Sequence, residues 1–315
     1  MKTELLKGVF DMHIHSFPDV APRKDDDIGL AKAAAAAGMG GIMLKAHQGS
    51  TVERAHLVGK LVDGIHVFGG VVLNRPQGGL NPHAVAVYVR LGAKEIWMPT
   101  LSADHMIRYQ NTRVTPEERT AFNMAHGASD IFPPGLAKPG DPWPWSKEGR
   151  GISIFDDTGK LRTEVMIILE IMAPSQTILG TGHLSLQETH ALVDAAMEMG
   201  VKRIVLTHPE YMDLVPVEDQ IELAQKGVFM ERCLLATNPA TRSIGGNLPF
   251  DVLADNIRKV GVASTVLGTD FGQKKNIHPV EGMTHYLMEL EKAGFTQSEI
   301  EQMAIKNPSG LLGLI

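Results

Sequence analysis

Short apolar stretches alternate with longer amphipathic stretches along most of the chain. The short ones have the length and the β-branched or aromatic content of buried strands, and the longer ones repeat apolar residues at helical spacing. Strands are predicted at residues 8–17, 41–47, 66–74, 94–100, 177–185, 203–211, 228–235 and 264–272. Helices are predicted between them, at residues 25–41, 51–64, 81–92, 162–173, 186–200, 217–227 and 250–261, and over most of the C-terminal segment.

This order of elements predicts an α/β fold with a parallel sheet, and eight strand–helix units predict a (β/α)₈ TIM barrel. The alternative, an open doubly wound sheet, usually has a glycine-rich phosphate loop after its first strand, where this chain has HIHSFPD. We expect residues 1–315 to form one domain. The exception to the rhythm is the segment 101–160, which is rich in Pro and Gly and is predicted to be an irregular insertion or lid after the fourth strand.

The composition restricts the kinds of partner. The 315 residues are 43% hydrophobic and carry a formal net charge of −6, without a basic cluster, so a nucleic-acid surface is not expected. No apolar stretch is long enough to span a membrane, and the first residues lack the apolar core of a signal peptide. The single cysteine, Cys233, suits a reducing compartment, and we expect a cytoplasmic protein. Trp143 and Trp145 in the insertion could close over a substrate or form a homo-oligomer contact.

Polar residues with metal-binding side chains follow several predicted strands at the same relative place. His13 and His15 end the first strand, His183 the fifth, His208 the sixth and Asp270 the eighth. Residues two apart on a strand share a face, and the carboxyl ends of barrel strands meet at one mouth, where TIM-barrel active sites lie. A lone buried histidine is usually a hydrogen-bonded core residue. Repetition at four of the eight strand ends favours a site instead.

The residue types indicate the chemistry. Neutral imidazoles and a carboxylate suit Zn²⁺, with Fe²⁺ and Mn²⁺ as alternatives, and zinc is our first choice. A catalytic ion lowers the pKa of a bound water toward neutrality. Asp270, alone at the last strand, could accept the proton of that water and pass it to a leaving group. We assign His208 to the metal site and, with Asp270, to the catalytic groups.

HIH, GHLS, THPE and TDFG stand in the order and at the places of a known pattern, and in this the chain resembles the amidohydrolase superfamily of metal-dependent barrels. The resemblance covers nearly the whole chain. It implies that His13, His15, His183, His208 and Asp270 hold the metal and that hydroxide attacks an amide, ester, lactone or phosphoester. Members with two ions bridge them by a carboxylated Lys or a Glu from the fourth strand. Here that strand ends EIWMPT, with its glutamate at the start, so we expect one ion per chain.

Five further residues are candidates around this site. Lys45 and His47 share a face at the end of the second strand. Lys45 could bind a substrate anion, or it could extend to solvent or pair with a neighbouring acid, and His47 could contact substrate or a second ion. Arg75 and His105, in the loops after the third and fourth strands, could contact substrate or be solvated. Glu231 on the seventh strand could support a metal-bound histidine or form a salt bridge.

The sequence therefore predicts a metal-dependent hydrolase acting on a small, anionic substrate. The first alternative is a decarboxylase or other lyase with the same metal site. The second is a barrel that binds metal or ligand without catalysis, which Asp270 disfavours because a structural zinc site has four protein ligands and no spare carboxylate.

Overall fold

Eight parallel strands form one sheet, in chain order, in the computed structural model, which describes residues 2–119, 151–239 and 246–315. Each neighbouring pair from β1–β2 to β7–β8 is parallel. The strands are β1 (Phe10–Ile14), β2 (Gly41–Leu44), β3 (His66–Val72), β4 (Glu95–Trp97), β5 (Ile178–Gly180), β6 (Ile204–Thr207), β7 (Phe229–Cys233) and β8 (Thr265–Gly268). Every predicted strand is present, and each is shorter than predicted because its C-terminal residues leave the sheet at the mouth.

Backbone hydrogen bonds join the last strand to the first. The Asp270 amide donates to the His13 carbonyl, and the His15 amide donates to the Phe271 carbonyl, both at 2.8 Å. The carboxylate of Asp11 accepts from the backbone and the hydroxyl of Thr269, at 2.9 and 2.6 Å. The sheet is therefore a nearly closed barrel, and the prediction of a TIM barrel is confirmed.

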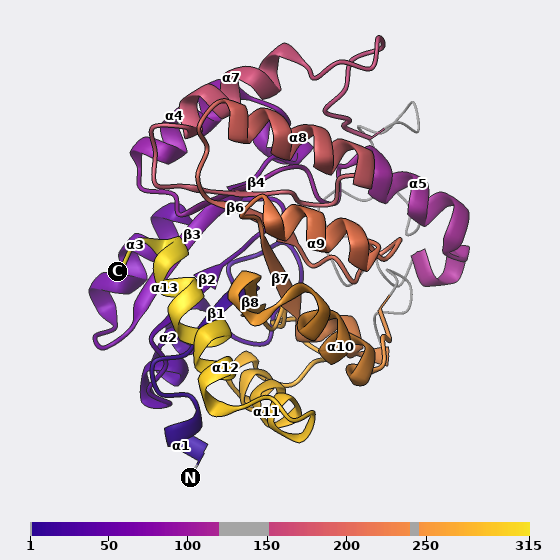
Figure 1. The fold of residues 1–315 in the computed structure, drawn as a ribbon. Coiled ribbons are helices and arrows are strands. Elements are labelled where there is room, and N and C mark those ends of the chain that lie inside the picture. The colour runs from indigo at the N-terminus through magenta and orange to yellow at the C-terminus, as the bar shows by residue number, and fades with distance from the viewer. Residues whose placement is uncertain (1, 120–150, 240–245) are drawn as a thin grey trace.

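Helices surround the strands on all sides (Figure 1). They are α1 (Lys2–Leu5), α2 (Asp27–Ala36), α3 (Val52–Leu61), α4 (Pro82–Arg90), α5 (Asp104–Arg113), α7 (Thr163–Met172), α8 (Leu186–Glu198), α9 (Val217–Gln225), α10 (Phe250–Val260), α11 (Pro279–Lys292), α12 (Gln297–Glu301) and α13 (Asn307–Leu312). Polar caps set several starts, as the sequence indicates: the Asp26 carboxylate accepts from the Gly29 amide before α2, and Ser185 and Glu188 form a capping box at α8. None of the described helices is long and apolar enough to cross a membrane.

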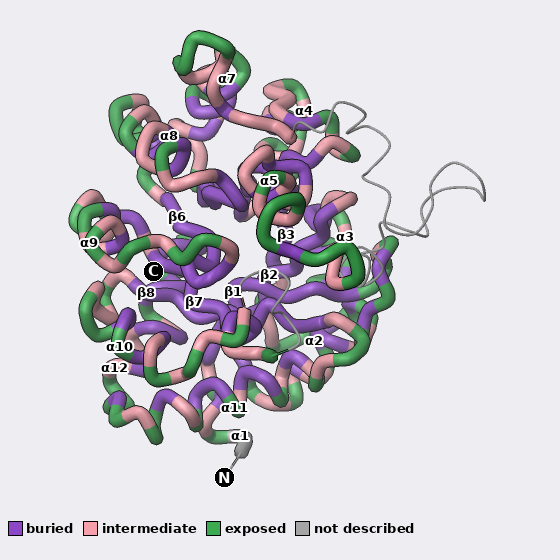
Figure 2. The backbone as a smooth tube through the Cα atoms, turned by 90° about the vertical axis from the view of Figure 1, so that its right-hand side faces the viewer, coloured by how far each residue is buried: buried purple, intermediate pink, exposed green. Residues whose placement is uncertain are grey.

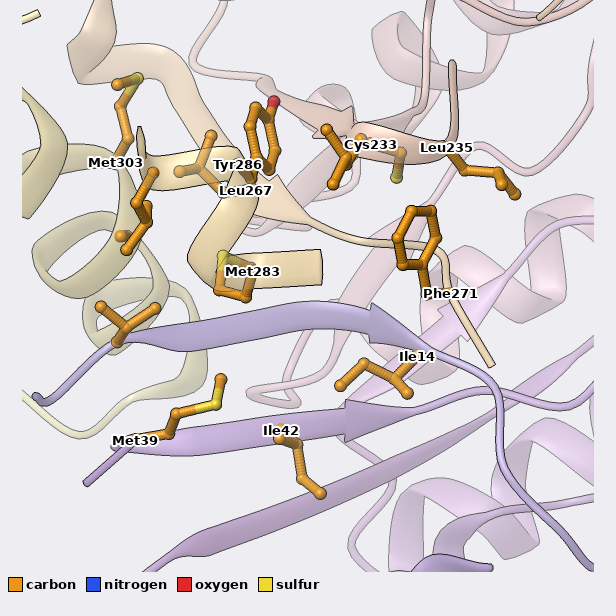
Figure 3. Packing of buried hydrophobic residues seen from close by; sticks show 14 of the residues in the cluster. Ile14, Met39, Ile42, Cys233, Leu235, Leu267, Phe271, Met283, Tyr286 and Met303 are labelled. Carbon is orange, nitrogen blue, oxygen red and sulfur yellow. The ribbon is translucent and has the colours of Figure 1, made fainter. Parts of the chain in front are cut away.

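The buried residues lie in the central strands and on the inner faces of the helices, and the exposed residues lie on the outer faces (Figure 2). One cluster packs β1, β2 and β8 against the surrounding helices, and it includes Ile14, Leu267 and Met283 (Figure 3). Another cluster takes Met12, Trp97 and other residues from nearly every strand, together with Leu312 of α13. Residues from so many strands can meet only inside the barrel, so the barrel interior is filled with side chains. A binding site must therefore lie at the barrel mouth.

The segment 101–160 is more regular than predicted where it is described. Helix α5 occupies part of it, with Asp104 in its first turn and Met106 as its buried residue. Phe155 and Leu161 form an antiparallel bridge, at the place where the sequence suggests a small hairpin. Trp143 and Trp145 lie outside the described residues, so their predicted role is not addressed.

Candidate metal centre

The strand ends bring the predicted residues to one cavity at the barrel mouth. Its volume is about 20 Å³, which is room for about one water-sized sphere. Such a space fits an ion or a water. The lining residues are His13, Lys45, His47, Leu101, Met106, His183, His208, Tyr211, Met212, Leu235, Asp270 and Gln273.

Imidazole nitrogens and a carboxylate oxygen converge around this cavity. Asp270 Oδ1 lies 3.4 Å from His13 Nε2 and 3.1 Å from His15 Nε2. His183 Nε2 lies 3.2 Å from His208 Nε2. Donors about 2.1 Å from a tetrahedral ion lie roughly 3.4 Å from one another, so these separations are those of a ligand set. The ring centroids of His13 and His208 are 5.7 Å apart, so the two groups are neighbours, and the ligand atoms of His13, His15 and Asp270 all lie within 4.8 Å of one another.

Local backbone conformation aims these side chains. The pairing of β1 with β2 shifts register between Asp11 and Ile14, a bulge of the kind that re-aims side chains beside active sites. His208 and Asp270 have φ of 29° and 53°, values that non-glycine residues rarely adopt. Such strain persists only where the surrounding contacts impose it, and it is common at functional sites.

Glycines permit the chain to turn closely at two of these strand ends. Gly182, with φ of 62°, precedes His183, and a Cβ on it would lie 2.3 Å from the Met98 carbonyl oxygen. Gly272, with φ of 127°, follows Asp270 by two residues, and its Cβ would lie 1.7 Å from the His15 carbonyl oxygen. The first glycine lets the chain after β5 cross the end of β4, and the second lets β8 close against β1.

Burial keeps the histidines neutral and therefore able to ligate. Desolvation, then the nearby Lys45, lowers the pKa of His13 to about 3, although Asp270 opposes the shift. Desolvation also lowers the pKa of His208 well below its usual value, with His183 as the next cause.

Glu231 lies behind His13, with its Oε2 2.9 Å from His13 Nδ1. When the shared proton is on Nδ1, the Nε2 lone pair faces the cavity, so this contact selects the tautomer that can bind metal. Burial raises the pKa of Glu231 to about 8, while Lys45 lowers it and Asp270 raises it. Cys233 is buried, as predicted, and its Sγ lies 3.8 Å from the same Nδ1.

Lys45 is only 1% exposed, so its tip does not reach solvent and that alternative is wrong. Its Nζ lies 5.2 Å from the centroid of the Trp97 ring and makes no hydrogen bond within the described residues. Desolvation lowers its pKa, and Glu231, Asp270 and Glu95 oppose that shift. Lys45 is therefore a buried amine that lines the cavity, and nearby carboxyl groups favour its charged form.

His47 is held by its neighbours at the edge of the donor set. Its Nδ1 lies 2.9 Å from Thr100 Oγ1, and its carbonyl accepts from the Asn74 side chain at 3.0 Å. Its ring stacks on His15, with centroids 4.9 Å apart.

Arg75 and His105 are placed differently from the other candidates. Arg75 begins the 3₁₀ helix η1 (Arg75–Gln77) and lines a wider cavity of about 570 Å³ together with Ser153, Arg162 and Glu164. His105 is in the first turn of α5, where the sequence suggested a loop. Neither residue lines the small cavity among the described residues.

Three residues of the site are missed by the sequence analysis. Tyr211 donates from its hydroxyl to Asp270 Oδ2 at 3.1 Å. Glu95, at the start of β4, does not line the cavity among the described residues, as its place in the strand indicates, but burial raises the pKa of its carboxyl group, which interacts with Glu231 and Lys45. Asp11 fixes the β1–β8 seam beside His13. Only the short spacing of Tyr211 from His208 offered any sequence signal.

Comparisons with solved structures support the fold. An amidohydrolase from Pseudomonas aeruginosa superposes with a TM-score of 0.62 at 13% identity, covering 98% of this chain and 97% of that one. A phosphotriesterase homology protein from Escherichia coli, with phosphate in its active site, gives 0.54 at 13% identity, covering 98% and 99%. An organophosphorus hydrolase variant from Deinococcus radiodurans gives 0.56 at 13% identity, covering 98% and 94%.

At such low identity, these likenesses establish the barrel fold alone. No curated protein matches the chain. One family model matches residues 8–231, which is most of the barrel. By that match, the chain belongs to the family of unknown function DUF6282.

Proposed function

We propose that this protein is a metal-dependent hydrolase that activates water for attack on a small, anionic substrate. The observation that carries the proposal is the gathering of imidazole nitrogens and one carboxylate oxygen at four strand ends. Asp270 Oδ1 lies 3.1–3.4 Å from the Nε2 atoms of His13 and His15, and the Nε2 atoms of His183 and His208, which line the same cavity as His13 and Asp270, lie 3.2 Å apart. Buried polar groups of this kind are costly unless something satisfies them together. A single divalent cation does so.

The donor set consists of His13, His15, His183, His208 and Asp270. Zinc is the first choice, with manganese and iron as alternatives that accept the same ligands. We propose one ion per chain, because no carboxylate of β4 lines the cavity among the described residues. When bound, the ion supplies a Lewis acid and acidifies water toward neutral pH.

Asp270 is the proposed proton carrier. Oδ1 faces His13 and His15, and Asp270 lines the cavity, which has room for about one water molecule. It accepts the proton of the attacking water and returns it to the leaving group. His208, whose pKa is lowered by burial and which lines the same cavity, is proposed as the second catalytic residue.

Lys45 is the proposed anchor for the substrate anion. Its buried amine has no hydrogen-bond partner among the described residues and lines the cavity, so an entering carboxylate or phosphate would stabilise its charged form. His47 is proposed to contact the same substrate, and Arg75 and His105 lie further out. Phosphate in the active site of the Escherichia coli relative is consistent with an anionic ligand.

The test is metal content per chain, measured on protein purified without added metal. Wild type is expected to hold about one equivalent, and a His13→Ala/His15→Ala double variant is expected to lose it. Asp270→Asn is expected to keep the metal and to lose turnover. No metal in the wild type, even after reconstitution, would overturn the proposal.

Product analysis then separates hydrolysis from the lyase alternative. Panels of esters, lactones, amides and phosphoesters are incubated with the metal-loaded protein in ¹⁸O-labelled water. Incorporation of one labelled oxygen into product supports hydrolysis. Release of carbon dioxide without incorporation supports a decarboxylase instead.

A further inference from the structure

Tyr211 connects the end of β6 to the end of β8. Its hydroxyl donates to Asp270 Oδ2 at 3.1 Å, and its ring centroid lies 4.2 Å from that of His208. The side chain is 4% exposed and lines the small cavity. It therefore touches two members of the donor set, one through its hydroxyl and the other through its ring.

The two oxygens of Asp270 have different neighbours. Oδ1 faces the Nε2 atoms of His13 and His15, and Oδ2 accepts the hydrogen bond from Tyr211. A carboxylate on a strained backbone can turn about its last side-chain bond unless one oxygen is held. The Tyr211 hydroxyl holds Oδ2 and so keeps Oδ1 directed at the histidines.

Tyr211 is itself fixed by the loop that carries it. Its amide donates to the His208 carbonyl at 3.1 Å, which closes a tight turn after β6. The neighbouring Glu210 forms a fully buried ion pair with Arg232 of β7. The backbone of Tyr211 is thus held by its own amide hydrogen bond and by the ion pair of its neighbour Glu210, and neither contact involves Asp270.

We propose that Tyr211 is a positioning residue, whose hydroxyl orients Asp270 for metal binding and proton transfer. The inference rests on the proposed function, because only that function makes Asp270 a metal ligand. Residues that hydrogen-bond to a metal-ligating side chain typically raise metal affinity about 10–100-fold. We expect an effect of about that size here.

The first measurement is the Zn²⁺ affinity of Tyr211→Phe, determined by competition with a chromophoric chelator and repeated with Co²⁺. The substitution removes the hydroxyl and keeps the ring against His208, so the affinity is expected to fall about 10–100-fold. Tyr286→Phe is the matched control, because Tyr286 is equally buried and its hydroxyl donates to the Arg232 carbonyl at 3.3 Å, away from Asp270. Its affinity is expected to equal that of wild type.

A double-mutant cycle asks whether Tyr211 acts through Asp270. In an Asp270→Ala background, Tyr211→Phe is expected to cause no further loss of Zn²⁺ affinity. The same loss in both backgrounds would overturn the inference and assign the effect to the ring or to His208. Wild-type affinity in Tyr211→Phe would overturn it as well, while leaving the proposed function intact. Absence of Zn²⁺ and Co²⁺ binding by wild type would overturn both.

Discussion

The buried ion pair between Arg232 and Glu210 makes a quantitative prediction about stability. Both side chains are fully buried, and the pair joins β7 to the loop after β6 that carries His208. Arg232→Met removes one charge and leaves the Glu210 carboxyl group buried among apolar side chains. Breaking a buried pair in this way costs about 3–5 kcal/mol, because the remaining charge has lost its partner and its water.

The magnitude depends on the loss of pairing and not on the loss of packing. Burial already outweighs the attraction of Arg232 and raises the pKa of Glu210, so the pair is poorly compensated even when intact. Replacing both residues by apolar ones, Arg232→Met with Glu210→Leu, is therefore expected to recover stability to within about 1 kcal/mol of wild type. The sum of the single effects should exceed the effect of the double variant by several kcal/mol.

The assay is denaturant unfolding followed by tryptophan fluorescence and circular dichroism, together with thermal melts. At about 2–4 °C per kcal/mol, Arg232→Met should lower Tm by roughly 10 °C. Lys226→Met is the control, because Lys226 pairs with Asp194 at 2.7 Å on the surface and should lose under about 1 kcal/mol. A cost below about 1 kcal/mol for Arg232→Met, or additive effects of the two substitutions, would refute the reasoning.

Three further predictions concern the site and its support. Lys45→Met should keep the metal but weaken binding of inorganic phosphate at least about tenfold by calorimetry, since one charge-assisted contact is lost; unchanged binding would remove Lys45 from the substrate site. Gly272→Ala should abolish metal binding and lower Tm sharply, because its Cβ would lie 1.7 Å from the His15 carbonyl oxygen. Gly200 also has a positive φ, of 87°, but open space around it, so Gly200→Ala should cost only about 1–2 kcal/mol in a melt. Ser185→Ala removes the cap of α8 and should cost about 1 kcal/mol in denaturant unfolding, with no loss counting against the cap.

The sequence was informative about the fold because each barrel strand has a local sequence pattern that can be recognised without knowing its partners. Each strand is a short apolar run before a helical stretch, so eight strands could be counted without knowing how they pair. Order along the chain then fixes order in the sheet, since successive parallel strands usually lie side by side. The predicted irregularity of 101–160 was the least accurate element, because helix α5 has weak apolar periodicity among many polar residues.

The types and strand positions of the donor residues were also readable from the sequence. His13 and His15 are two apart, and His183, His208 and Asp270 each follow a strand, which places them at one mouth in any parallel barrel. Their partners were not readable, because those contacts join distant parts of the chain. Glu231 is 218 residues from His13, and nothing local distinguishes a carboxylate behind a histidine from one in a salt bridge.

Only the tertiary structure decided how these groups are held and protonated. The burial of Lys45 and the hydrogen bond of Tyr211 to Asp270, 59 residues away, both depend on how the loops fold over the mouth. So does the pairing of Glu210 with Arg232. Hydrophobic periodicity is a property of neighbouring residues and fixes which elements form. Hydrogen bonding, desolvation and charge pairing at the mouth depend on distances between residues far apart in the chain, and only the folded strands and loops determine those distances.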